Sequence, residues 1–152
     1  MAKLKLKYES LTSAIKTLER AIFVFEKIKN KKTKSLPNFI DEDVTYEDIY
    51  KAARDSLAQR FEFSIELFWK YLKEYLSEKG IIANTDSPKD VIRSGCKAKL
   101  ISEEDTEIFF EMLKSRNLTS HIYKEELAEK LALVINSFCE VLKRNIDDLK
   151  PE

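Results

Sequence analysis

The chain has 152 residues, of which 27 are basic and 27 are acidic, so its formal net charge is zero. This length predicts one domain, residues 1–152, that buries a core without disulfides or structural metals. Proteins that bind polyanions in general are usually basic, so any contact with nucleic acid here must come from a local patch. The chain has 2 glycines and 3 prolines, and so few breaks indicate long helices.

The cysteine spacing and the hydropathy pattern indicate where the protein works. Cys96 and Cys139 are far apart and form neither a zinc-site spacing nor a disulfide framework, which fits a reducing cytoplasm. The N-terminal stretch MAKLKLKYES lacks the continuous apolar run of a secretory signal. No segment reaches the ~18 apolar residues that span a bilayer. We therefore expect a cytoplasmic protein that makes no membrane contact and, lacking a metal-ligand cluster or a glycine-rich phosphate loop, needs no metal or cofactor.

The first predicted helix spans residues 7–32. Its apolar side chains recur at spacings of three and four and should face the core; they are Tyr8, Leu11, Ile15, Leu18, Ile22 and Phe25. The helix ends in the basic run KIKNKKTK, residues 27–34. This run is either a solvated terminus favoured by the helix dipole or a contact for RNA or a protein partner.

A connector at residues 35–43, broken by Pro37, leads to a second predicted helix at residues 46–79. Thr45 and Asp48 have the spacing of a capping box, and Gly80 supplies a stop. A helix of this length is roughly 50 Å long at ~1.5 Å per residue, so it needs a bundle to lie along. Its apolar residues are Ile49, Leu57, Phe61, Ile65, Phe68, Trp69, Leu72 and Tyr75.

Three further helices complete the predicted fold. One begins at Ser87 with Pro88 in the first turn and runs to Lys99, and the next begins at Ser102 and ends near Arg116. The last spans residues 124–149, and its predicted core face is Leu127, Leu131, Val134, Ile135, Phe138, Val141 and Leu142. No strand-like alternation competes with these patterns. The fold class is therefore all-α, an antiparallel four-helix-type bundle built from five helices.

The stretch SRNLTSHIY contains the one histidine of the chain, His121. On a continuous helix Arg116 and His121, five residues apart, point about 140° away from each other. They share a site within one chain if the helix kinks or ends between them. Asn117, Thr119 and Ser120 favour such an end because their side chains compete for backbone hydrogen bonds.

An arginine and a histidine together suit the cleavage of an RNA phosphodiester. Histidine, with an unperturbed pKa of about 6.5, exchanges protons near neutral pH, and the arginine fork binds phosphate oxygens. Taken alone, the same residues also fit a structural role. His121 is then a cap or a hydrogen-bonded structural residue, and Tyr123 is a half-buried aromatic.

Three segments in order, QRFEFSIELFWKYLKEYL, SPKDVIRSGCKAKLI and RNLTSHIY, are similar to the HEPN family, specifically its nucleotidyltransferase substrate-binding subunits. Arg116, His121 and Tyr123 match the R-x4-H-x-Y signature, and Asn117 matches the usual polar residue after the arginine. The resemblance implies a homodimer with the motifs of both chains near its interface, paired with a minimal nucleotidyltransferase. In several such pairs the HEPN subunit is an RNA-cleaving toxin, without a metal, and the partner neutralises it by attaching AMP to the tyrosine. Arg116 then binds phosphate, His121 is the general acid/base, and Tyr123 is the modification site.

Other interpretations stay open at this point. The sequence also fits a non-catalytic subunit that presents a substrate to the nucleotidyltransferase, or a purely structural bundle. A nucleophilic Cys139–His121 pair is conceivable, although Cys139 follows an apolar stripe and packing is its default role. Glu62 and Glu66, one turn apart, either reach into the site from the facing helix or form solvated charges or a structural ion pair.

Overall fold

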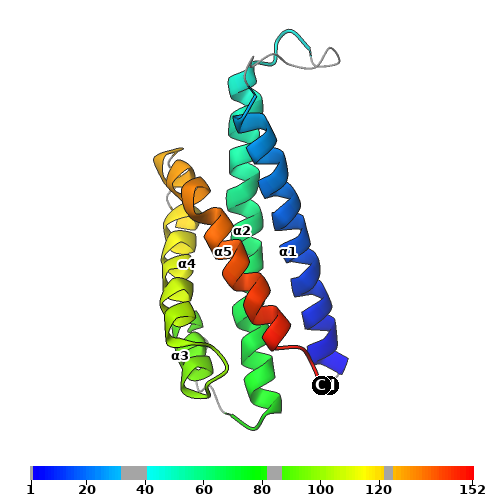
Figure 1. Cartoon of the computed structure of the whole chain (residues 1–152), viewed down its shortest axis with the longest axis vertical. Helices are drawn as coiled ribbons and strands as arrows, with labels where there is room; N and C mark the ends of the chain where they lie inside the picture. The colour runs from blue at the N-terminus through cyan, green and yellow to red at the C-terminus, as the bar shows by residue number, and fades with distance from the viewer. Residues whose placement is uncertain (1, 32–40, 82–86, 122–124) are drawn as a thin grey trace.

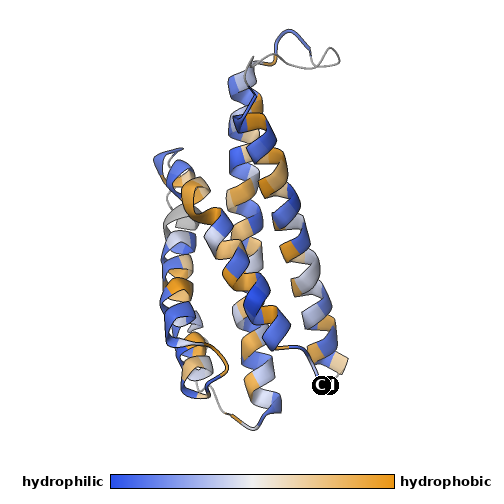
Figure 2. Ribbon diagram, in the orientation of Figure 1, coloured by the Kyte–Doolittle hydropathy of each residue, from blue (hydrophilic) through white to orange (hydrophobic). Residues whose placement is uncertain are grey.

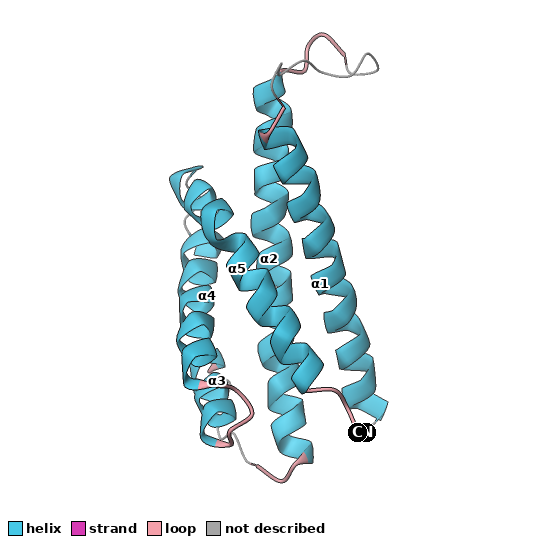
Figure 3. Ribbon diagram, in the orientation of Figure 1, coloured by secondary structure: helices cyan, strands magenta, loops and turns pink. Residues whose placement is uncertain are grey.

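The computed structural model describes residues 2–31, 41–81, 87–121 and 125–152, excluding the side chains of residues 118–121. Helices make up nearly all of it, and no strand occurs in these ranges (Figure 3). The helices are α1 (Ala2–Lys29), α2 (Tyr46–Glu78), α3 (Pro88–Lys97), α4 (Glu103–His121) and α5 (Glu125–Asp148). The predicted all-α class and the five helices are confirmed.

The two longest helices, α1 and α2, lie antiparallel and side by side (Figure 1). α5 packs against both of them and also against α4, and the short α3 lies beside the first half of α4 (Figure 1). Because α2 contacts all four other helices, it is the central element of the bundle. Apolar and polar residues alternate along every helix (Figure 2), as expected where one stripe faces a shared core.

Local sequence signals set several helix ends. Thr45 and Asp48 form both hydrogen bonds of the capping box at the start of α2. Gly80, at φ +77°, takes the left-handed conformation that ends the same helix. The Ser102 hydroxyl accepts the backbone N–H of Asp105 at the start of α4. Ser87 occupies the N-cap position of α3 as predicted, although its side chain makes no capping hydrogen bond.

Three predicted boundaries of α1 and α3 are wrong. α1 ends at Lys29 rather than at residue 32. α1 begins five residues before residue 7, because Leu4 continues the apolar stripe and is buried. α3 ends at Lys97 rather than Lys99, because Lys99 takes the left-handed conformation at φ 61°. The connector around Pro37 and residues 32–34 of the basic run lie outside the described residues. Lys27 and Lys29 of that run lie in the last turn of α1.

The predicted apolar stripes form the core with four exceptions. Tyr8, Ile49 and Leu127 are half-buried, and Val134 is 40% exposed because it borders a pocket of about 240 Å³ between α4 and α5. At the centre, the fully buried rings of Phe68 and Phe109 stack with centroids 4.5 Å apart and planes 11° apart, which ties α4 to α2.

A buried polar cluster joins the start of α4 to the end of α5. The Asp105 carboxylate accepts a hydrogen bond from Arg144 Nη2 at 2.7 Å and from Asn145 Nδ2 at 2.9 Å. Asp105 and Asn145 are both buried. The hydrogen bond from Arg144, and then that from Asn145, hold the pKa of Asp105 below its ordinary value despite burial.

Replacing Asp105 with asparagine should lower the free energy of unfolding at pH 7 by about 1.5–3 kcal/mol, because a charge-assisted hydrogen bond is lost. The folded-state pKa is depressed, so this stabilisation is complete above the unfolded pKa of about 3.9. It disappears as the pH falls through the folded-state pKa. Urea unfolding of D105N and wild type at pH 7 and at stepwise lower pH measures this. A difference that stays constant as the pH falls would contradict the proposed role.

Candidate functional site

The motif stretch lies on a continuous helix. α4 runs through Arg116 to His121, so the predicted helix end near Arg116 is wrong. Residues such as asparagine, threonine and serine lower helix stability by less than about 0.7 kcal/mol each, too little to end a helix by themselves. Positions 116 and 121 therefore lie about 140° apart around the α4 axis. The helix break that the two side chains would need to converge within one chain is not present between these positions.

Arg116 is held by a carboxylate of the facing helix. Its Nη1 lies 3.1 Å from Glu66 Oε2, and the two side chains are 25% and 31% exposed. The other Glu66 oxygen, Oε1, lies 3.4 Å from Lys70 Nζ. Glu66 thus forms an ion pair, and because its partner is the motif arginine, it also reaches the motif from the facing helix. Glu62 is half-buried one turn earlier on α2.

Arg116 and Asn117 line a pocket of about 450 Å³ between the first turn of α3 and α4. Sites that hold small molecules have volumes of about 300–1,000 Å³. The cations in the lining are Lys89, Lys114 and Arg116, and they outnumber the carboxylates of Glu107 and Glu111. The pocket therefore has the size for a nucleotide-like group, and its three cations are balanced by these two carboxylates together with Glu66, which pairs with Arg116.

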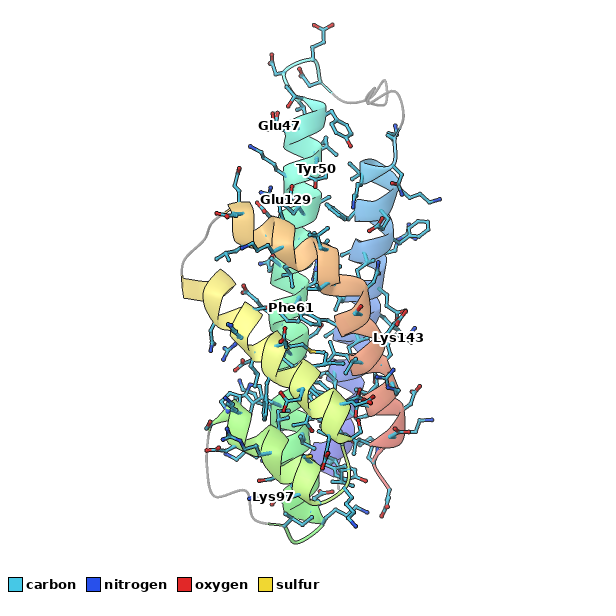
Figure 4. The ribbon with its side chains drawn as sticks, turned by 60° about the vertical axis from the view of Figure 1, so that its left-hand side comes forward. Glu47, Tyr50, Phe61, Lys97, Glu129 and Lys143 are labelled. Atoms are coloured by element: carbon cyan, nitrogen blue, oxygen red, sulfur yellow. The ribbon has the colours of Figure 1, made fainter. Side chains whose placement is uncertain are left out.

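A second group of charges fixes the start of α5 against α2. The Tyr50 hydroxyl donates to Glu129 at 2.9 Å, and Figure 4 shows these two side chains facing each other from α2 and α5. Lys51 Nζ lies 3.1 Å from Glu125. The guanidinium of Arg54, 3% exposed, lies 3.2 Å from Asp55 and 3.8 Å from Glu129. These contacts set the position of α5 from its first residue, two places after Tyr123.

Arg54 was not singled out from the sequence as a buried, paired charge. The core spacing of Leu57, Phe61 and Ile65 extends back to position 54, so a charged residue on that stripe was the available signal. A buried arginine is rare unless it is paired.

The remaining candidate residues fall into two groups. Cys139 is buried in the core, and burial raises the pKa of its thiol to about 11, so it is protonated near neutral pH and the packing role is confirmed. Tyr123 and the side chain of His121 lie outside the described residues. Arg116 and Asn117 are the two motif residues that the structure brings to one pocket.

Neither a metal cluster nor a membrane span occurs in the described part of the chain. No group of three or more histidine, cysteine, aspartate or glutamate side chains in it is placed to hold a metal ion. None of its helices is long and apolar enough to cross a membrane.

Comparison with known proteins places the chain in a family. The family model of nucleotidyltransferase substrate binding protein like proteins matches residues 6–151. A solved structure from Thermus thermophilus is 27% identical, with a TM-score of 0.62 over 88% of this chain and 99% of that one. A chain from a toxin–antitoxin structure solved with AMP-PNP is 18% identical, with a TM-score of 0.57 over 92% and 97%. No curated protein matches significantly.

The two solved structures confirm the fold, the second one by its shape alone. The family model covers almost the whole chain, including the motif stretch and both helices that hold the Arg116 ion pair. The chain belongs to the family of nucleotidyltransferase substrate binding protein like proteins.

Proposed function

We propose that the chain is a HEPN-type, metal-independent endoribonuclease that works as a homodimer and is controlled by a minimal nucleotidyltransferase. The observation that carries this is the position of Arg116. The arginine borders a nucleotide-sized pocket with Asn117 beside it, and a fixed carboxylate, Glu66, keeps its guanidinium in place. A guanidinium held in this way suits the recognition of a phosphate group.

The proposed reaction is an internal transesterification of RNA. His121 accepts the proton of a 2′-hydroxyl, the 2′-oxygen attacks phosphorus, and the bond between phosphorus and the 5′-oxygen breaks. The same imidazole, now protonated, gives that proton to the leaving 5′-oxygen, and Arg116 stabilises the charge on the phosphorane. The products are a 2′,3′-cyclic phosphate and a 5′-hydroxyl, and the reaction requires no metal ion or oxidant.

The continuous α4 helix favours a composite site. Since positions 116 and 121 lie about 140° apart on one helix, we place Arg116 of one copy with His121 of a second copy. The isologous interface of a two-fold dimer brings the same segment of both chains together, so two such sites form at once. The resemblance to the HEPN family supports this arrangement, because it implies a homodimer with the motifs of both chains near the interface.

The nucleotidyltransferase is proposed to attach AMP to Tyr123, two residues after His121. An added AMP brings bulk and a negative phosphate beside the imidazole and the arginine, and it competes with RNA for Arg116. The family description names a nucleotidyltransferase, and one structural neighbour comes from a toxin–antitoxin complex, which supports this pairing.

A second candidate function is a non-catalytic subunit that presents a substrate to the nucleotidyltransferase. Two observations favour it. Glu66 already neutralises Arg116, and Glu107 and Glu111 line the same pocket, which weakens its attraction for a polyanion. The family description also speaks of substrate binding.

The two functions are separated by one pair of assays. The chain is purified from cells that lack the nucleotidyltransferase and is incubated with tRNA in EDTA. The mass of its Tyr123 peptide is measured by mass spectrometry. We expect cleavage that leaves 2′,3′-cyclic ends. Co-expression with the nucleotidyltransferase should add AMP to Tyr123 and abolish the cleavage. Intact RNA at high protein concentration, with Tyr123 unmodified, would support the binding subunit instead.

A further inference from the structure

A groove runs along the α1–α2 pair, apart from the Arg116 pocket. Two pockets of about 370 and 210 Å³ adjoin there, because Thr17 and Arg60 line both of them. No residue of this α1–α2 groove also lines the Arg116 pocket. Figure 1 shows the two helices side by side over most of their length.

Small side chains form much of the α1 wall, where Ser10, Ser13, Ala14 and Ala21 contribute. Small residues let the backbone of another helix approach closely, so the groove can accept a packed helix. On the α2 side Phe63 is 56% exposed, and it offers an aromatic anchor of the kind that dominates binding energy at interfaces.

The charge of the α1–α2 groove is one-sided. Arg20 and Arg60 line it, and no carboxylate does. Among the described residues, Arg60 makes no ion pair, and Arg20 lies over the ring of Phe23 at 4.8 Å. An occupant that brings carboxylates between apolar side chains would satisfy both the arginines and the apolar wall.

This charge argues against a second copy of the chain in a symmetric interface. Two grooves face to face would bring Arg60 near its own counterpart, with no carboxylate of either groove between them. Like charges brought together in an interface cost several kcal/mol. The occupant is therefore a different protein.

We propose that the α1–α2 groove docks an apolar helix with at least one groove-facing aspartate or glutamate, supplied by the nucleotidyltransferase partner. The identity of the partner rests on the proposed function, whereas the kind of helix rests on the groove. Because the groove and the Arg116 pocket are separate, docking leaves that pocket open to substrate.

The test measures binding of the purified nucleotidyltransferase to the full chain by calorimetry. Phe63→Asp and Arg60→Glu should each weaken binding at least about tenfold. Leu6→Asp is the matched control, since Leu6 is 64% exposed on α1 and does not line the groove. It should bind like wild type. All three variants should keep the thermal stability and the RNA cleavage of the wild type.

The possible outcomes of this test distinguish the partnership from the docking site. Failure of the wild-type chain to bind the nucleotidyltransferase would overturn the proposed partnership itself. Wild-type binding that neither Phe63→Asp nor Arg60→Glu weakens would overturn the docking site and leave the partnership standing. A fall in the chain's own oligomeric state in these variants, measured by light scattering, would show that a second copy fills the groove and would also overturn the inference.

Discussion

His121→Ala should lower the rate of metal-free RNA cleavage by about 10²–10⁴-fold, the usual contribution of a positioned general acid or base. Arg116→Ala should lower it as well, because the phosphorane loses its cation. Arg116→Lys should recover part of the loss, since lysine keeps the charge without the planar fork. Single-turnover cleavage of a labelled RNA in EDTA measures all three, and Lys143→Ala, an exposed cation paired with Glu19, is the control.

The fold should survive these changes. Arg116 and Glu66 are each about one quarter to one third exposed, so their ion pair contributes less than about 1 kcal/mol to stability. Thermal unfolding should therefore place R116A close to wild type. A large loss of stability in R116A with unchanged cleavage would assign the arginine a structural role and remove the proposed mechanism.

Mixing the two inactive variants tests whether the site is composite. In a heterodimer of R116A and H121A, one site has lost both groups and the other has kept both. Random reassortment then restores about a quarter of the wild-type activity if each site draws on both chains. If each chain holds its own site, the mixture stays inactive, and the composite arrangement is wrong.

Phe109→Ala should have the largest effect on stability, a loss of about 3–5 kcal/mol. Phe109 is fully buried and stacks on Phe68, so alanine leaves a cavity between α4 and α2. The total stability of a domain is about 5–15 kcal/mol, so this loss is a large fraction of it. Because α4 carries Arg116, RNA cleavage should fall in step with the folded fraction.

The neighbouring Phe110→Ala is the control for this prediction. Phe110 is half-buried, and its ring meets Lys89 and Arg93 at 5.1 and 5.5 Å. Its loss should cost at most about half as much, because part of the ring already contacts solvent. Urea unfolding of both variants measures the difference. Equal losses would mean that the Phe68–Phe109 stack is not the main link between α2 and α4.

The sequence by itself determined the helices, most of their ends and the core. Thr45, Gly80 and Ser102 act through their immediate neighbours, and the spacing of apolar residues follows the helical period, so both are local properties. Tertiary structure decided what the polar residues do. Glu66 pairs with Arg116, which lies fifty positions away in the sequence, and Arg54 is buried because carboxylates of α5 reach it. The residues around Glu66 and Arg54 in the sequence do not indicate these partners. The sequence also did not predict that α4 continues to His121. Asn117, Thr119 and Ser120 prefer helix ends only weakly, and this preference is too small to end the helix.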